Sequence, residues 1–302
     1  MQAPGEGFLV SADPATNTIY AANTNLPQID VLNGATCRTG NLTGCAPVAK
    51  IPMADPFANI GTIDPATHTM YASDPFSDTV SVINTATCNA ADTSGCAQPS
   101  PAITVGPGPG PPALNPVTRT LYVPYGMKGS RVGVVNAATC NATDTSGCGQ
   151  VPAVVSVGQC TFSLAVSSAT DTVYAPSAGS VASNCTDGDT VPVINGATCN
   201  GTNTEGCGAH FPVMPAGRSP VAVTLDATTG FVYVADFSSA AVSVLNGSRC
   251  NAETAAVCGA AAREQPVGSG PQGITLNQRT HTVYVAEIYQ PGFMSIFTAA
   301  QH

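Results

Sequence analysis

The chain lacks tryptophan and is poor in charge, because only 9% of its 302 residues are charged. Nine are Lys or Arg and eighteen are Asp or Glu, which gives a formal net charge of −9. The basic residues are scattered singly and form no positive face for a phosphate backbone, so we expect no nucleic-acid partner. No run of about 18 apolar residues occurs either, so we expect no transmembrane segment.

Turn-forming residues are abundant instead, with 30 Gly and 25 Pro beside many Thr, Ala and Asn. Together with enough Val, Ile and Leu to fill a core, this composition is typical of a turn-rich β protein. The first residues, MQAPGEGF, contain no apolar signal-peptide segment. A leader that was already removed and a start inside a longer protein both remain open as explanations.

Most of the twelve cysteines occur in five pairs with the spacing C-x7-C, inside a repeated polar stretch such as ATCNATDTSGC (138–148). The pairs are Cys37 and Cys45, Cys88 and Cys96, Cys140 and Cys148, Cys199 and Cys207, and Cys250 and Cys258. Zinc sites usually combine closely spaced pairs that converge, whereas at least 43 positions separate each pair from the next (Cys45 to Cys88). We therefore predict a local disulfide in each pair and an oxidising, extracellular or cell-surface location.

Six tyrosines recur in alternating apolar runs such as NTIYAAN and HTVYVAE, at positions 20, 71, 122, 174, 233 and 284. Successive positions differ by 51, 51, 52, 59 and 51 residues. A unit of about fifty residues suits one four-stranded blade of a β-propeller. The sequence therefore predicts an all-β fold, a single six-bladed β-propeller domain over residues 1–302. Its repeat units lie at approximately 7–54, 55–106, 107–158, 159–217, 218–268 and 269–302.

Each unit is expected to hold four short strands, named A to D in chain order. Strand A, such as 220–226, leads through a turn rich in Asp, Pro and Thr to strand B, which carries the tyrosine. Strand C, such as 79–84 or 241–246, alternates with period two. The cysteine loop connects it to strand D, such as 101–106, and a Gly/Pro loop leads on to the next blade. On the chain-entropy model each disulfide stabilises its polar loop by about 2–3 kcal/mol.

The tyrosine strings resemble a known repeat. TVYVAE, TIYAAN and FVYVAD, preceded by DPAT-like turns and followed by strings such as VSVIN, resemble the YVTN-type repeats of YncE-like and surface-layer β-propellers. The resemblance spans the whole chain, and the ATCN…SGC loop is similar to one found in secreted bacterial propellers of this kind. Because most such families have no assigned activity, the resemblance implies a propeller fold and export, and no particular chemistry.

The sixth unit stops after its strand C, 293–298, and has neither a cysteine loop nor a strand D. Matching Asp13 to Asn277 places Met1 opposite Gln265. The N-terminal residues would therefore overlap only the end of the missing strand D, and they would complete the sixth blade poorly. Three explanations stay open: a ring with one three-stranded blade, a fragment of a longer array, or a strand donated by a neighbouring molecule. An unpaired strand edge is a template for another chain.

Polar residues three positions after the tyrosines end strand B, and propeller topology places them at one mouth of the central channel. Asn23, Asp74, Asp236 and Glu287 are among them, and Asp189 lies nearby in sequence. Oxygen ligands that converge there would suit Ca²⁺ or Mg²⁺. The alternative is a set of solvated strand ends. Arg218, on a D–A loop at the same face, would meet an anionic ligand or be an isolated surface cation.

Two cysteines remain outside the C-x7-C pairs. Cys160 lies in a D–A loop and Cys185 in the enlarged B–C loop of the fourth unit, 177–190. Topology brings both to one face, and by elimination we predict that they form a sixth disulfide. His68 and His281 occupy A–B turns on the opposite face, so a Ser-His-Asp site at the channel mouth lacks a base.

These observations favour an exported, disulfide-stapled propeller that acts as a non-catalytic binding or structural module without a required cofactor. Its expected partners are a protein, a cell-surface or extracellular polymer, or further copies of the chain joined through the incomplete blade. The rival hypothesis is a metal-assisted, lactonase-like hydrolase or lyase that uses Asp74, Asp236 and Glu287 at the channel mouth. This rival rests on architecture, which does not by itself imply function.

Overall fold

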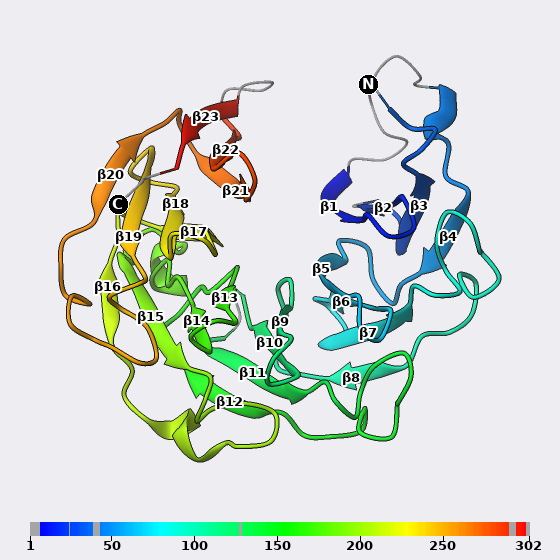
Figure 1. Cartoon of the computed structure of the whole chain (residues 1–302), viewed down its shortest axis with the longest axis horizontal. Helices are drawn as coiled ribbons and strands as arrows, with labels where there is room; N and C mark the ends of the chain where they lie inside the picture. The colour runs from blue at the N-terminus through cyan, green and yellow to red at the C-terminus, as the bar shows by residue number, and fades with distance from the viewer. Residues whose placement is uncertain (1–6, 24, 39–42, 127–128, 290–293, 300–302) are drawn as a thin grey trace. The chain divides into compact units, whose positions relative to one another are not determined.

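A computed structural model of the chain describes residues 7–23, 25–38, 43–126, 129–289 and 294–299. The described residues form 23 strands and three short 3-10 turns, Thr43–Cys45, Val181–Ser183 and Glu205–Gly208. The strands make six antiparallel sheets, and each sheet is one blade of a six-bladed all-β propeller (Figure 1). Within the described ranges no helix is long and apolar enough to cross a membrane.

The first three blades are simple meanders, in which each strand pairs with the next one along the chain. Blade 1 contains β1 (Gly7–Asp13), β2 (Thr18–Asn23), β3 (Gln28–Asn33) and β4 (Ala49–Pro52). Blade 2 contains β5 (Asn59–Asp64), β6 (Thr69–Asp74), β7 (Thr79–Asn84) and β8 (Ala102–Thr104). Blade 3 contains β9 (Ala113–Asn115), β10 (Thr120–Pro124), β11 (Arg131–Asn136) and β12 (Ala153–Ser156).

The next two blades repeat this order, and the last has three strands in the described residues. Blade 4 contains β13 (Ala165–Ser167), β14 (Thr172–Tyr174), β15 (Thr190–Asn195) and β16 (Val213–Pro215). Blade 5 contains β17 (Pro220–Leu225), β18 (Phe231–Asp236), β19 (Ala241–Asn246) and β20 (Arg263–Pro266). Blade 6 contains β21 (Pro271–Asn277), β22 (Thr282–Glu287) and β23 (Met294–Thr298).

Most expected strands agree with the observed ones. The two expected C strands are β7 and β19 with unchanged bounds, and the expected strand A at 220–226 is β17 without its last residue. The expected strand D at 101–106 shortens to β8, Ala102–Thr104, because a proline and a glycine flank it. The prediction that the N-terminus fills the sixth blade poorly concerns residues 1–6, which lie outside the described residues.

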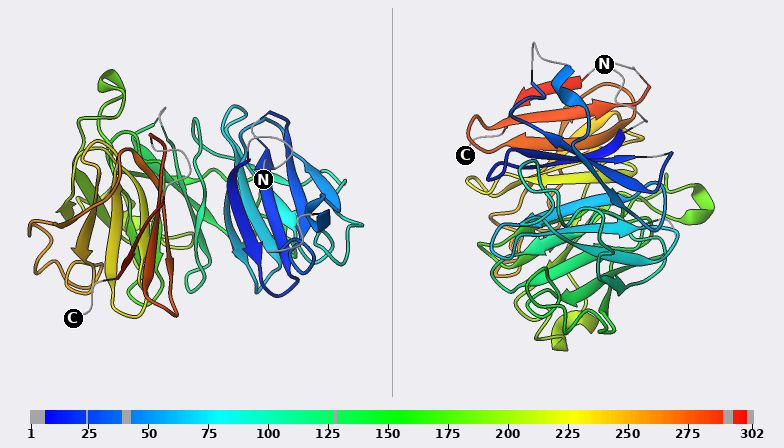
Figure 2. Two further views of the ribbon diagram at one scale, coloured as in Figure 1. Left: turned by 90° about the horizontal axis from the view of Figure 1, so that it is seen from above. Right: turned by 90° about the vertical axis from the view of Figure 1, so that its right-hand side faces the viewer.

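Contacts along the chain define two compact units. The first comprises Met1–Leu114 and Asn136–Pro152, and the second comprises Asn115–Val135 and Ala153–His302. Blades 1 and 2 belong to the first unit together with the cysteine loop of blade 3, while blades 4, 5 and 6 belong to the second. Figure 2 shows the blades of the second unit, coloured from green to red, side by side in chain order.

The A–B turns follow from their residues. In blade 2, Asp64 Oδ1 accepts the Ala66 N–H at 3.0 Å and Oδ2 accepts the Thr67 hydroxyl at 2.6 Å. His68 then takes a left-handed φ of 50°, which reverses the chain into β6. Asp favours such turns because its side chain bonds to the backbone two residues on. Asn17, Arg119, Asp171 and His281 are left-handed at the corresponding place in four other blades.

All twelve cysteines are joined in six disulfides, as predicted. Five close the C–D loops of blades 1 to 5, with Cα atoms 4.4–4.9 Å apart. The sixth joins Cys160 to Cys185, whose Cα atoms lie 5.8 Å apart. It ties the loop that enters blade 4 to the B–C loop of the same blade.

Strand B of one blade binds the cysteine loop of the next. Tyr71 donates its phenol O–H to the carbonyl of Cys140 at 2.9 Å, and Thr69 Oγ1 accepts the N–H of Ala142 at 2.8 Å. The same two bonds recur from Tyr20 and Thr18 to the loop of blade 2, from Tyr122 and Thr120 to that of blade 4, and from Tyr174 and Thr172 to that of blade 5. The loops are therefore parts of the blade interfaces as well as stapled connections.

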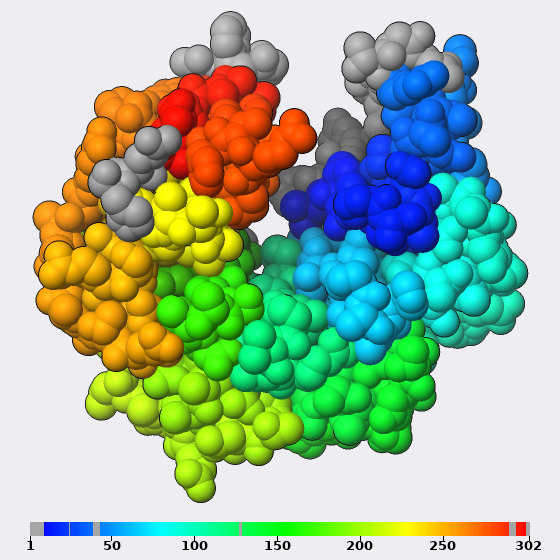
Figure 3. All heavy atoms as spheres, viewed as in Figure 1, coloured from blue at the N-terminus to red at the C-terminus, as the bar shows by residue number. Residues whose placement is uncertain are grey.

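Among the described residues, the interface between blades 5 and 6 contains no cysteine loop. Tyr233 is fully buried and packs on Phe297, with ring centroids 6.3 Å apart. Phe231 stands where the other four strands carry the loop-binding threonine. Tyr233 and Phe297 belong to one apolar cluster of the two blades, which touch in the space-filling view (Figure 3).

Candidate functional site

The residues predicted at the ends of strand B are placed in the two units separately. Asn23 ends β2 and Asp74 ends β6 in the first unit, while Asp236 ends β18 and Glu287 ends β22 in the second. All four side chains are buried. The expectation of solvated strand ends is therefore wrong for these residues. Asn23 Oδ1 accepts the N–H groups of Asn25 and Leu26 in its own B–C turn at 2.9 and 3.0 Å.

Serine partners in strand C hold three of these acids. The Ser81 hydroxyl donates to Asp74 at 2.9 Å and the Ser243 hydroxyl to Asp236 at 2.7 Å, and Ser295 donates to Glu287. The backbone of the entering loop adds further donors: the N–H of Ala54 bonds to Asp74 at 3.1 Å, and the N–H of Gly268 to Glu287 at 2.8 Å. Each acid thus joins strands B and C to the loop before strand A.

Burial changes the acidity of two of these groups. It raises the pKa of Asp236 to about 7, against the opposing effect of the Ser243 and Gly217 hydrogen bonds. Burial likewise raises the pKa of Asp74, and the bond from Ser81 partly offsets it. Among the described residues, Asp236 Oδ1 has no hydrogen-bond partner. A Cβ on Gly217 would lie 2.7 Å from the Asp236 carboxyl carbon, so this backbone covers the carboxyl group closely.

The predicted Ca²⁺ or Mg²⁺ site needs several converging oxygen ligands, since Ca²⁺ takes about 6–8 of them. In the described part of the chain, no group of three or more His, Cys, Asp or Glu side chains is arranged to hold a metal ion. Asp74, Asp236 and Glu287 direct carboxylate oxygens to donors within their own blades. The Ca²⁺ or Mg²⁺ site at the channel mouth stays a prediction, because Asn23 and Asp74 lie in the first unit and Asp236 and Glu287 in the second.

Asp189 lies in the enlarged loop of blade 4, and Arg218 lies in the loop that enters blade 5. Both side chains are exposed, and Arg218 Nη2 lies 3.5 Å from the carbonyl of Thr186. Hydrogen bonds from Ser183 and Ser180, with the positive charge of Arg218, lower the pKa of Asp187. The Ser219 hydroxyl bonds to the carbonyl of Cys185 at 2.7 Å, so the loop is fixed to the start of blade 5.

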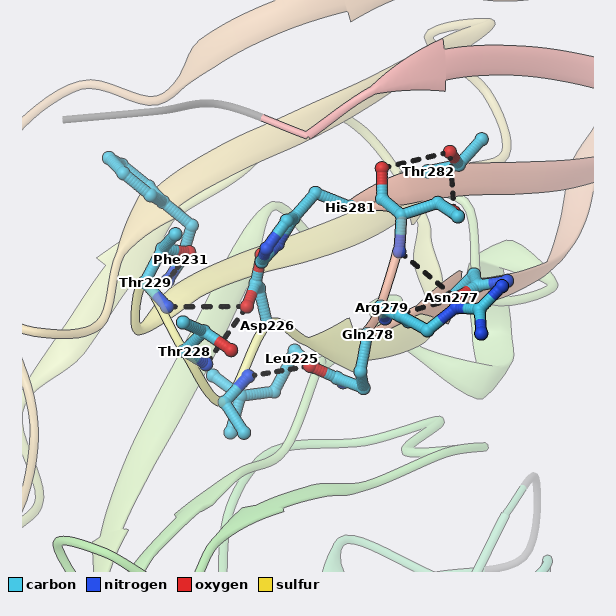
Figure 4. A network of polar contacts seen from close by, with 12 residues as sticks. Leu225, Asp226, Thr228, Thr229, Phe231, Asn277, Gln278, Arg279, His281 and Thr282 are labelled. Atoms are coloured by element: carbon cyan, nitrogen blue, oxygen red, sulfur yellow. Dashed lines mark hydrogen bonds and ion pairs between the residues drawn. The ribbon is translucent and has the colours of Figure 1, made fainter.

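A histidine–aspartate pair that was not predicted from the sequence joins blades 5 and 6. His281 Nδ1 lies 2.8 Å from Oδ2 of Asp226, which is fully buried in the A–B turn of blade 5 (Figure 4). Gln278 adds two bonds to the same turn, to the carbonyl of Leu225 at 2.7 Å and from the N–H of Ala227 at 3.1 Å. Burial alone raises the pKa of Asp226, but the bonds from His281 and the turn backbone outweigh it and lower that pKa.

The sixth blade presents the most distinct surface. Its outermost described strand, β23, pairs with β22 on one side, whereas strand C in the other five blades also pairs with a strand D. The side chains of Met294 and Ile296 are 51% and 57% exposed. Their counterparts in blade 5 are Val242, fully buried, and Val244, half-buried. Among the described strands, β23 therefore has no partner on its outer side.

No family model matches the chain, and no curated protein matches it. Among solved structures, a chain from "Crystal Structure of Mitotic Checkpoint Complex" is similar with a TM-score of 0.60 and 10% identity, over 92% of this chain and 70% of that one. A chain of Kuenenia stuttgartiensis hydrazine synthase is similar with a TM-score of 0.53 and 14% identity, over 99% and 97% of the two chains. At these identities the likeness shows the propeller fold alone.

Proposed function

We propose that the protein is a non-catalytic binding and structural module outside the cytoplasm, and that it binds partners by accepting a β-strand at the outer edge of blade 6. The observation that carries this proposal is the three-stranded sheet β21–β23, in which β23 pairs with β22 alone among the described strands. Strand addition to such an edge supplies main-chain hydrogen bonds for affinity and side-chain pockets for specificity. One protein of similar fold comes from a multiprotein complex, which agrees with a scaffold role.

Ile296 is the residue whose backbone would receive the added strand. It pairs with Tyr284, as Val82 pairs with Tyr71 and Val193 with Tyr174. In those two blades the strand C N–H points outward, from Val82 to the carbonyl of Pro101 at 2.8 Å and from Val193 to that of Pro212 at 2.9 Å. By the alternation of antiparallel strands, the Ile296 N–H points to the corresponding outer position.

An extracytoplasmic location and membership of the exported YVTN-type propellers are part of the proposal. Six disulfides support an oxidising compartment, because they are rare in the cytosol. The tyrosine repeats support the family, since each lies on strand B as that resemblance implies. In this setting the disulfide-closed loops stabilise the blades, and the sixth blade binds a β-strand of a partner.

A labelled peptide with the sequence SPAITVG, residues 100–106, tests the strand acceptor. It carries the strand D of blade 2, and we expect it to bind the oxidised protein in a fluorescence anisotropy titration. Ile296→Pro removes only the outward N–H, because proline is tolerated on strand edges, and should abolish binding. Ile296→Thr keeps the N–H group and should still bind the peptide. Equal binding by the proline variant, with its unfolding transition unchanged, would refute the strand acceptor.

A further inference from the structure

Two phenylalanines on the loops of blade 2 form an exposed aromatic pair. Phe57 lies in the loop that enters blade 2, and Phe76 lies in the turn between β6 and β7. Their ring centroids are 6.3 Å apart, and the rings meet edge to face at 74°. The two residues are 45% and 62% exposed, so neither ring fills the core. We call Phe57 and Phe76 the blade 2 aromatic pair.

The contacts that hold the loops of the pair lie within the first unit. The Phe57 N–H donates to the carbonyl of Asn23 at 3.3 Å, which fixes this loop to the end of β2 in blade 1. Asp78, at the end of the turn that carries Phe76, accepts the N–H of Gly108 at 2.9 Å. All of these residues belong to the first unit, so the geometry of the pair is set within that unit.

The backbone at Phe57 is unusual for a bulky residue. Phe57 has a left-handed φ of 66°, in a region that favours glycine because a Cβ is crowded there. It lies seven residues before the first residue of its A–B turn, and four other blades are left-handed at the same place, with Gly108, Cys160, Ser219 and Gly270. Phenylalanine is the bulkiest of these five residues. Backbone strain at an exposed side chain is typical of positions that bind a ligand.

Carboxyl groups flank the pair on both sides. Asp55 and Asp78 each lie two residues from a ring, one before Phe57 and the other after Phe76. Among the described residues, Oδ2 of Asp55 accepts no hydrogen bond. The Lys and Arg residues of the first unit lie elsewhere, in its first cysteine loop and in β4. The charge of the two loops therefore complements a positively charged ligand.

We propose that the blade 2 aromatic pair binds an arginine or lysine side chain of a partner protein. A cation is attracted to the face of an aromatic ring, and the neighbouring carboxyl groups add to this attraction. Two rings at 74° form a corner of two faces, against which a planar guanidinium group can stack. This contact lies on a different blade from the strand acceptor, and it adds a basic segment to the partners of the protein.

A short arginine peptide tests this assignment. The peptide GRGRG, with acetylated and amidated ends, is titrated into the oxidised, nitrogen-15-labelled protein and followed by nuclear magnetic resonance. The same peptide with citrulline in place of arginine has nearly the same shape and no charge. The arginine peptide should shift the amide signals of Asp55, Phe57, Phe76 and Asp78, and the citrulline peptide should not. GKGKG should shift the same signals.

Variants separate the aromatic contact from general attraction to an acidic protein. Phe57→Leu keeps an apolar side chain but removes the ring, and it should weaken binding of GRGRG by about two- to fivefold. Phe57→Tyr keeps the ring and should bind like wild type. Val151→Ala, at a position of the same unit that is 93% exposed and lies outside these loops, should also bind like wild type.

Equal shifts with the citrulline peptide, or equal affinity of wild type and Phe57→Leu for GRGRG, would overturn the proposal. The peptide SPAITVG contains no Arg or Lys, so its binding tests the strand acceptor separately. The two proposals can therefore fail independently.

Discussion

The phenol of Tyr122 donates a 2.8 Å hydrogen bond to the carbonyl of Cys199, 77 residues further along the chain. Both residues are fully buried. The bond joins strand B of blade 3 to the disulfide loop of blade 4, and equivalent bonds join three other pairs of blades. The repeated tyrosine and the repeated cysteine loop are therefore two halves of one interface.

Removing this hydroxyl should destabilise the fold. Tyr122→Phe leaves a buried carbonyl without its donor, and we expect a loss of about 1–2 kcal/mol in the free energy of unfolding, measured with urea under oxidising conditions. Tyr284→Phe is the matched control, since its hydroxyl has no partner among the described residues, and it should change that free energy by less than about 0.5 kcal/mol. Similar losses in the two variants, measured on the monomer, would contradict this assignment.

Removing the disulfide of a loop that strand B binds should lower the stability of the fold more than removing the disulfide of the first loop. Replacing Cys140 and Cys148 by Ser should cost about 2–3 kcal/mol from the lost cross-link and about a further 1 kcal/mol from the contacts of Tyr71 and Thr69. Replacing Cys37 and Cys45 removes a cross-link of the same length without the contacts of Tyr71 and Thr69, so it should cost about 2–3 kcal/mol. Thermal unfolding of both double variants compares them, and a larger loss from the Cys37 pair would argue against loop binding as a source of stability.

Asp236 should make stability depend on pH near neutrality. Its pKa is raised from 3.8 to about 7 in the folded state, so between these values the unfolded chain ionises first and stability falls as pH rises. The Asn side chain of Asp236→Asn does not titrate. Relative to wild type, the free energy of unfolding of this variant should therefore rise by up to about 1.4 kcal/mol per pH unit from pH 5 to pH 7, and no further above pH 7. Urea titrations at several pH values measure the difference, with the exposed Asp189→Asn as control. A difference that does not change with pH would show that Asp236 ionises normally.

His281 should stabilise the interface of blades 5 and 6. His281→Ala leaves the fully buried Asp226 without its 2.8 Å partner, and we expect a loss of about 1–3 kcal/mol. His68→Ala is a close control because both histidines are left-handed, with φ of 48° and 50°, so the backbone strain on Ala is the same. His68 is exposed, and its replacement should cost the strain alone. Equal losses would mean that the His281 contact contributes nothing.

The sequence predicts the strands and the disulfides because both depend on local patterns. Period-two alternation places β7 and β19 with correct bounds, and the C-x7-C spacing allows a bridge within each loop. The binding of Tyr71 to Cys140 was not predicted, because it joins residues 69 positions apart. One signal for it is present: the threonine two residues before the tyrosine is replaced by Phe231 in the blade whose neighbour has no cysteine loop.

The acids of the candidate site show where pattern analysis ends. Their positions at the ends of strand B follow from the tyrosine repeat, but topology alone does not give the direction of a side chain. A serine seven residues after Asp74 and Asp236 is the available signal, since Ser81 and Ser243 hold these carboxylates inside their blades. A buried and hydrogen-bonded acid differs from the predicted solvated strand end.

Amide hydrogen exchange of β23 tests the central claim most directly, namely that the sixth blade offers an open strand edge. In the oxidised protein at low concentration, the outward amide of Ile296 should exchange rapidly, while that of Val244 in β19, which pairs with β20, stays protected. Adding the SPAITVG peptide should slow exchange at Ile296 and leave Val244 unchanged. Protection of Ile296 equal to that of Val244 before any peptide is added would show that the edge is already filled, and would contradict the account.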